Sequence, residues 1–179
     1  MRGGAQLTPF DLRIEQYDEN RHFFLSHYFY ENYDRWMSKL PYISSGITIS
    51  RVEVWVTNKR GNYDQARDVV AFMDMGEISN ERLQNTHWQV SPSVKVPAND
   101  GNSLYGEINR DYPDARIMNM VNSTLEPLET LYGIKGGEDY EKVENARRLD
   151  PSEYRVNTQL GYVSLNSMLQ PDEVLAVAF

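Results

Sequence analysis

Turn-forming residues interrupt the stretch from residue 150 to residue 179 so often that only short strands fit between them. The breaks fall at DP (150–151), NTQLG (157–161) and QP (170–171). The runs that remain, EYRV, GYVSL and EVLAVAF, have the β-branched and aromatic composition of strands. The first two are close enough in sequence to pair as a hairpin, so this region predicts antiparallel sheet.

A further strand is predicted in ITISRVEVWV, residues 47–56. Val52, Val54 and Val56 alternate with other residues, which is the pattern of a strand with one apolar face. Ile47 and Ile49 have the opposite phase, and this change predicts a β-bulge at Ser50-Arg51.

The chain then continues through a polar loop into another apolar run. NKRGNYDQARD (58–68) has no apolar pattern and is interpreted as a loop, with Gly61 as its turn residue. DVVAFMDM (68–75) has apolar residues on both faces, which is typical of a central, buried strand.

Helices are predicted in two places. A strand over residues 22–30 is expected to be followed by a short helix from Asn32, as the N-cap, to Pro41. A longer helix is predicted over 114–133, with Pro127 kinking it or starting a second turn. It would be capped by Asp114, and its apolar stripe would comprise Ile117, Val121, Leu125 and Leu128.

These elements predict an α+β fold that is mainly antiparallel and sandwich-like, with a helical insertion; an all-β sandwich is the alternative. Residues 1–21 are interpreted as a leader and residues 22–179 as a single β-rich domain. The irregular or helical insertion is placed at about 79–137. A length of 179 residues suits one domain with its own core.

Composition limits the classes of partner and compartment. The net charge of −8, from 26 acidic and 18 basic residues, disfavours nucleic acid and anionic membrane surfaces as partners. The absence of cysteine excludes disulfides, cysteine-bound zinc and thiol catalysis, but it leaves the compartment open. No apolar run approaches the roughly 20 residues of a membrane helix, and MRGGAQLTPFDLR has no signal-peptide core. A glycine-bearing start and a strand-like end predict a piece excised from a longer protein.

Motifs for catalysis or metal binding are missing from the sequence. No G-x-S-x-G, S-x-x-K or phosphate-loop spacing is present, so we expect no enzyme, no catalytic residue and no cofactor. The histidines lack ligand spacing and are interpreted as hydrogen-bonded in or near the core; they are His22, His27 and His87. A structural calcium at Asp100, Asn102 and Glu107 is a minor alternative, because DGNSLYGE misses the EF-hand pattern.

Trp55 is the aromatic residue whose position is hardest to assign from the sequence, because it shares a strand face with Glu53 and Thr57. The favoured interpretation is that it packs under a helix or loop of this domain. In the other interpretation Trp55, Tyr63 and Arg67 form an exposed interaction surface for protein or sugar. A carbohydrate-binding β-sandwich that uses these three residues is therefore the alternative function.

Two long runs of the sequence carry a family resemblance. They extend from LTPFDLRIEQYDENRHFF through VEVWVTN to AFMDMGE (7–77), and from ENARRLDPSEYRV through LGYVSLN to LQPDEVLAVAF (144–179). Both runs resemble the SprA/Sov family of Bacteroidota, whereas the middle, roughly 79–137, carries less of the likeness. Members of this family are very large outer-membrane proteins that form the translocon barrel of the type IX secretion system. They are needed for gliding motility in some species and protease secretion in others.

The resemblance implies a non-enzymatic role in protein export, without catalytic residues to carry over. The implied partners are other secretion-system subunits and exported proteins, and the implied location is the cell envelope, facing periplasm or cell exterior. Glu53 lies opposite the valines of its strand and the mean hydropathy is −0.62, which favours a soluble domain of the translocon over strands of the barrel wall. Unpaired strand edges, including EVLAVAF, are predicted to accept a partner strand.

Overall fold

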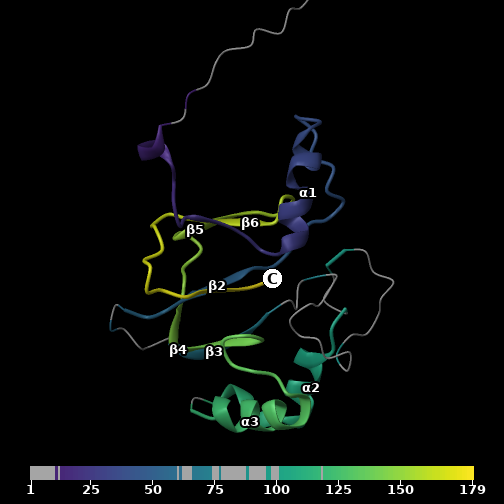
Figure 1. The fold of residues 1–179 in the computed structure, drawn as a ribbon, viewed down its shortest axis with the longest axis vertical. Helices are drawn as coiled ribbons and strands as arrows, with labels where there is room; N and C mark the ends of the chain where they lie inside the picture. The colour runs from purple at the N-terminus through teal and green to yellow at the C-terminus, as the bar shows by residue number, and fades with distance from the viewer. Residues whose placement is uncertain are drawn as a thin grey trace, which may run out of the picture.

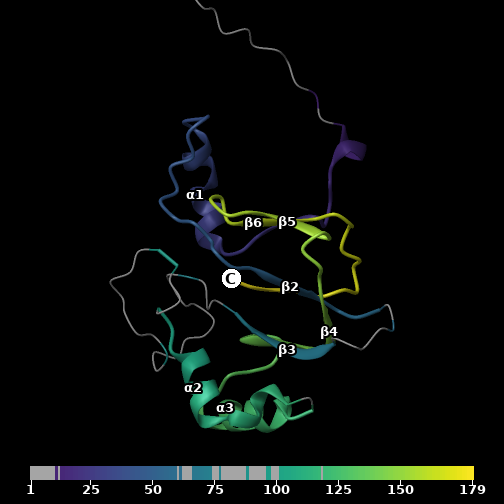
Figure 2. The same ribbon diagram turned by 180° about the vertical axis from the view of Figure 1, so that it is seen from behind.

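The structure, a computed structural model, describes residues 11, 13–59, 61, 66–73, 77, 88, 96–97, 101–117 and 119–179. Within these residues the chain forms three α-helices and seven strands, arranged in two antiparallel sheets that do not close into a barrel. Figure 1 shows three layers: the sheet with β5 and β6, the sheet with β2, β3 and β4, and a layer with helices α2 and α3; Figure 2 shows the same order from behind. The predicted α+β fold with antiparallel sheets is confirmed.

The three-stranded sheet has the order β1-β6-β5, with β1 at His22–Phe24, β5 at Tyr154–Asn157 and β6 at Tyr162–Leu165. Strands β5 and β6 form the predicted hairpin. Its turn ends at Gly161, whose φ of 65° lies in the left-handed region. A Cβ atom at this glycine would lie 2.1 Å from the ring of Phe29, so glycine is required for conformation and for space.

The four-stranded sheet has the order β3-β4-β2-β7. Its strands are β2 (Glu53–Val56), β3 (Arg67–Phe72), β4 (Tyr140–Arg148) and β7 (Leu175–Ala178). The prediction that β3 would be central is wrong, since it forms an edge of this sheet. Val70 and Phe72, which share one face of β3, pack against the buried cluster around α3.

Strand β4 was not predicted, because its buried residues Tyr140, Val143 and Ala146 recur every three positions and not every two. A register shift explains the spacing between Val143 and Ala146, since Arg67 pairs with Ala146 but Val69 pairs with Val143. Such a shift is a β-bulge, and Asn145 adopts a left-handed conformation there, with φ 52°. The N–H group of Asn145 donates to the Asp68 carboxylate at 2.9 Å, which satisfies a main-chain group that the bulge leaves out of the ladder.

The predicted bulge at Ser50-Arg51 is wrong, because residues 47–52 form no strand and β2 begins only at Glu53. The N–H group of Ile49 donates instead to the carbonyl of Thr158, just beyond β5, at 2.9 Å. The segment therefore passes from the three-stranded sheet to the four-stranded sheet. The apolar phase changes because the chain changes sheets.

The main core lies between the two sheets. Val54 and Val56 of β2 face Val163 and Leu165 of β6, and these four side chains are buried. Burying a side chain of this kind stabilises a fold by about 1.5–3 kcal/mol.

The predicted strand over residues 22–30 is wrong beyond Phe24, and the helix begins five residues before Asn32. Helix α1 spans His27–Met37, with Ser26 in an extended conformation at its N-cap. The Glu77 carboxylate accepts hydrogen bonds from the N–H groups of His27 and Tyr28, at the helix start. A partner fifty positions away in the sequence therefore stabilises the start of this helix.

The lower layer contains α2 (Leu104–Asp111), a 3-10 helix (Pro113–Arg116) and α3 (Val121–Tyr132). The predicted continuous helix from residue 114 is wrong, because Asn119 is left-handed with φ 70° and interrupts it. Helix α3 continues through Pro127 without a second start. None of the helices among the described residues has the length and apolar character that crossing a bilayer requires.

Helix α2 is likewise not predicted from the sequence. The side chain of Asn102 accepts a hydrogen bond from the N–H group of Leu104 at 2.8 Å, and Glu107 lies in the first turn. An Asn-Ser pair followed by an acidic residue is a recognised helix-start signal. The prolines and glycines on either side of this signal favour an irregular segment instead of a helix.

Candidate functional site

Two of the three residues predicted to form an interaction surface lie among the described residues. Trp55 in β2 is half-buried and stands opposite Ala176 of β7 and Arg148 of β4. Arg67 is exposed at the first position of β3, and Tyr63 lies outside the described residues. The side chain of Trp55 is thus partly covered by the protein and partly exposed to solvent. Its role as a contact residue stays a prediction.

A different group of aromatic side chains gathers on the outer face of the three-stranded sheet. Phe24 is at its centre, with ring centroids 5.5 Å from Tyr30, 5.4 Å from Tyr33 and 6.2 Å from Tyr162. All three contacts are edge-to-face, the arrangement that aromatic pairs prefer. Phe24 is 38% exposed and Tyr30 is 65% exposed, so these four residues form an accessible aromatic surface.

The fold brings the aromatic surface together from three elements. Phe24 of β1 and Tyr162 of β6 are direct partners in the antiparallel ladder, so their side chains share one face. Tyr30 and Tyr33 are three residues apart on α1, which places them on adjacent turns. Phe29 and the similarly buried Trp36 fix α1 in place, and Tyr33 packs against the same buried cluster.

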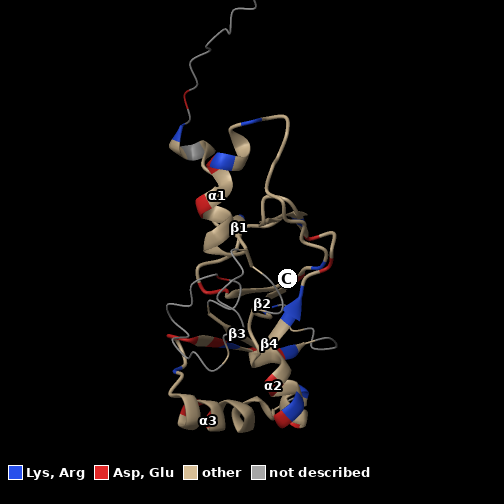
Figure 3. Cartoon of the chain, turned by 90° about the vertical axis from the view of Figure 1, so that its right-hand side faces the viewer, with Lys and Arg blue, Asp and Glu red and all other residues tan. Residues whose placement is uncertain are grey.

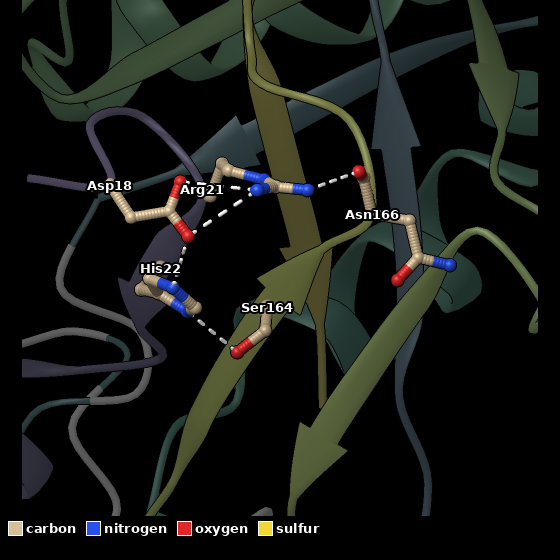
Figure 4. A network of polar contacts seen from close by, with 5 residues as sticks. All are labelled: Asp18, Arg21, His22, Ser164 and Asn166. Atoms are coloured by element: carbon tan, nitrogen blue, oxygen red, sulfur yellow. Dashed lines mark hydrogen bonds and ion pairs between the residues drawn. The ribbon is translucent and has the colours of Figure 1, made fainter. Parts of the chain in front are cut away.

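A polar network lies next to the aromatic surface (Figure 4). His22 is paired in register with Ser164, and its Nδ1 lies 2.8 Å from the serine Oγ. Its Nε2 lies 3.3 Å from Oδ2 of Asp18, and the Arg21 guanidinium donates to Oδ1 of the same carboxylate at 3.2 Å. The hydrogen bond from Arg21, assisted by that from His22, lowers the pKa of Asp18. Arg21 also donates to the main-chain carbonyl of Asn166.

In this network the histidine lies between the aspartate and the serine and is in contact with both, as in a hydrolytic triad. Ser164, however, lies within β6, which pairs with β1 on one side and β5 on the other. The main-chain N–H groups around Ser164 are therefore directed into ladders and do not form an oxyanion hole. The network is better suited to positioning, because Arg21 ties the turn before β1 to the end of β6.

The residues considered as metal ligands have other partners. Asn102 caps α2, and Glu107 accepts hydrogen bonds from the Trp88 indole and the Ser103 hydroxyl, both at 3.1 Å. Asp100 and His87 lie outside the described residues. The part of the chain that the structure describes contains no group of three or more metal-ligating side chains. His22 and His27 are exposed, so their expected place in or near the core is wrong, although the His22 ring is hydrogen-bonded as expected.

An open groove of about 480 Å³ runs between α3 and β4. Glu126, Glu129 and Lys142 line it, and Lys142 donates to the side chain of Asn122 at 2.9 Å. The hydroxyl of Tyr140, which also lines the groove, donates to Glu129. Burial, followed by this hydrogen bond, raises the pKa of Tyr140 from its ordinary value of 10.0 to about 12.

The raised pKa of Tyr140 predicts a loss of stability in alkali. The folded state favours the protonated phenol, so this contribution is complete below the unfolded pKa of 10.0 and disappears as the pH rises through about 12. Its size is about 3 kcal/mol. Tyr140→Phe should weaken the decline in stability between about pH 9 and about pH 12 in urea titrations. Tyr42→Phe, at an exposed position, is the control; equal declines for Tyr140→Phe and wild type would contradict the assignment.

Neither protein-family models nor curated proteins match this chain. Within the described residues, the aromatic surface is the feature that best combines exposure, large apolar side chains and a rigid support. Exposed aromatic side chains on a rigid support are characteristic of sites that bind other molecules.

Proposed function

We propose that this chain is a non-enzymatic, protein-interaction domain of a SprA/Sov-type translocon. Its role would be structural, in the export of proteins across the outer membrane by the type IX secretion system and in gliding motility. It would lie in the cell envelope, facing periplasm or cell exterior. Other secretion-system subunits and exported proteins would be its partners.

The observation that carries this proposal is where the two resembling runs lie in the fold. VEVWVTN contains β2, and LQPDEVLAVAF contains β7; these strands pair from Glu53↔Ala178 to Val56↔Leu175. LGYVSLN contains β6, whose Val163 and Leu165 pack against β2. Segments from both ends of the chain thus form one continuous core, as expected if the resemblance extends over a real structural unit.

The middle of the chain, which carries less of the resemblance, supports the same view. Helices α2 and α3 lie on the side of the four-stranded sheet away from β5 and β6 (Figure 1). Their core is a separate cluster that includes Leu104, Leu125 and Leu128. A segment in this position can vary without disturbing the packing between the two sheets.

Exposed aromatic side chains favour a protein partner for this domain. Phenylalanine and tyrosine are enriched at protein–protein interfaces, and rigidly held aromatic side chains lose little entropy on binding. The carbohydrate alternative depended on Trp55 as an open platform, and Trp55 is half-buried between two strands.

Affinity capture from cell-envelope extract tests the proposal. The whole chain is expected to retain other secretion-system subunits or exported proteins, identified by mass spectrometry. A Tyr30→Ala variant should retain less of them, whereas Tyr42→Ala, which alters an exposed tyrosine outside the aromatic surface, should retain the same amount. Capture of proteins unrelated to secretion, in equal amounts by all three chains, would count against the proposed function.

A further inference from the structure

We propose that the aromatic surface and the open edge of β1 together bind an extended, basic peptide segment, which adds to the three-stranded sheet as a further strand beside β1. This inference rests on the proposed protein-interaction role but not on membership of any family. It names the chemistry of the partner and the strand that receives it.

Strand β1 is the more accessible of the candidate edges. At the other edge of the same sheet, the carbonyl of Thr158, just after β5, accepts a hydrogen bond from the N–H group of Ile49. The hydroxyl of Tyr154 in β5 donates to the carbonyl of Val52. In the four-stranded sheet, β7 lies near β3, the strand at the opposite edge. The terminal strand that the sequence suggested is therefore the less favourable acceptor.

The outward groups of β1 follow from its ladder with β6. The carbonyl of Arg21 accepts from the N–H of Leu165 at 2.8 Å, and the N–H of Leu25 donates to the carbonyl of Gly161 at 2.9 Å. Arg21, Phe23 and Leu25 thus direct their main-chain groups to β6. His22 and Phe24 direct theirs away from β6, because these directions alternate along a strand. No residue among those described is seen to hydrogen-bond these outward groups.

A strand added at this edge would place alternate side chains on the aromatic surface. His22 and Phe24 have exposed side chains on the outer face, whereas Phe23 faces the core between the sheets. Residues of the added strand would follow the same alternation. One set would lie beside Phe24 and Tyr30, and the other beside Phe23.

The charges around the aromatic surface favour a basic side chain in the outer set. Asp34 lies one helical turn from Tyr30 on the same side of α1, and Glu31 is the next residue after Tyr30. Both carboxylates are exposed, and neither forms an ion pair within the described part of the chain. Figure 3 shows acidic residues on α1. An arginine or lysine over the Tyr30 ring would have a π-face beneath it and a carboxylate beside it, within a chain of net charge −8.

Peptide binding in solution tests the inference. The probe is a fluorescein-labelled peptide of alternating valine and arginine, titrated against the whole chain and followed by fluorescence anisotropy. We expect saturable binding that weakens with added salt. Tyr30→Ala and Asp34→Asn should each weaken binding by about tenfold, and Tyr42→Ala should leave it unchanged. Both altered side chains are exposed on α1, so the fold is expected to persist, which circular dichroism checks.

Two control peptides distinguish strand addition at β1 from non-specific electrostatic attraction. A peptide of alternating valine and glutamate should not bind, and a peptide N-methylated on alternate residues should lose affinity because it cannot complete a ladder. Amide exchange measured by NMR should show new protection at His22 and Phe24 when the arginine peptide binds. Equal binding of the glutamate peptide, or no new protection at these two amides, would overturn the inference. If secretion-system subunits are still captured from envelope extract in that case, the proposed function stands without it.

Discussion

Gly161→Ala is expected to lower the free energy of unfolding by about 3 kcal/mol. Two costs add at this position. The residue has φ 65°, which strains any residue with a Cβ atom, and that atom would lie 2.1 Å from Cδ1 and Cγ of Phe29. Phe29 is only 1% exposed and packs with Trp36, so its ring has no free space to enter. Urea unfolding followed by tryptophan fluorescence measures the change.

Gly46→Ala is the matched control for Gly161→Ala. Gly46 has nearly the same backbone conformation, with φ 69°, but no atom lies within 4 Å of the position its Cβ would take. This substitution should therefore show only the backbone cost, about 1 kcal/mol. Equal losses for the two variants would mean that the contact with Phe29 is not a constraint on the fold.

Trp36→Ala is expected to destabilise the protein by about 3–5 kcal/mol. Trp36 is 2% exposed, and its ring lies edge-on to Tyr28 at 5.7 Å and Phe29 at 6.2 Å. Removing the indole leaves a cavity under α1, the helix that supplies two of the four rings of the aromatic surface. The loss should appear as a lower urea midpoint with little change in slope.

Tyr30→Ala on the same helix provides the comparison. Tyr30 is 65% exposed, and its only ring contact among the described residues is with Phe24. Its removal should cost less than about 1 kcal/mol. A loss as large as that of Trp36→Ala would contradict the assignment of inner and outer sides of α1, and with it the accessibility of the aromatic surface.

Strands with regular local patterns could be predicted from the sequence. β2, the β5–β6 hairpin and β7 were all predicted because alternation and flanking turn residues are local properties. β4 was not, although it pairs with both β2 and β3. Its bulge at Asn145 breaks the alternation, and the bulge is stabilised by Asp68 from a distant strand.

The aromatic surface could not be predicted for a related reason. If residues 22–30 formed one strand, Phe24 and Tyr30 would lie about 20 Å apart along it. The chain instead turns into α1 after Leu25, and their ring centroids lie 5.5 Å apart. The Glu77 carboxylate stabilises the start of α1 from outside any local window of the sequence.

The sequence by itself determined the class of this protein, an α+β domain of short antiparallel strands, because alternation, turn residues and composition act over a few neighbouring positions. Only the tertiary structure decided which strands are edges, where α1 begins, and that Phe24, Tyr30, Tyr33 and Tyr162 share one face. Those outcomes depend on hydrogen bonds and packing between residues far apart in the chain. Such contacts have no period in the sequence, and their energies exceed the local preferences that they override.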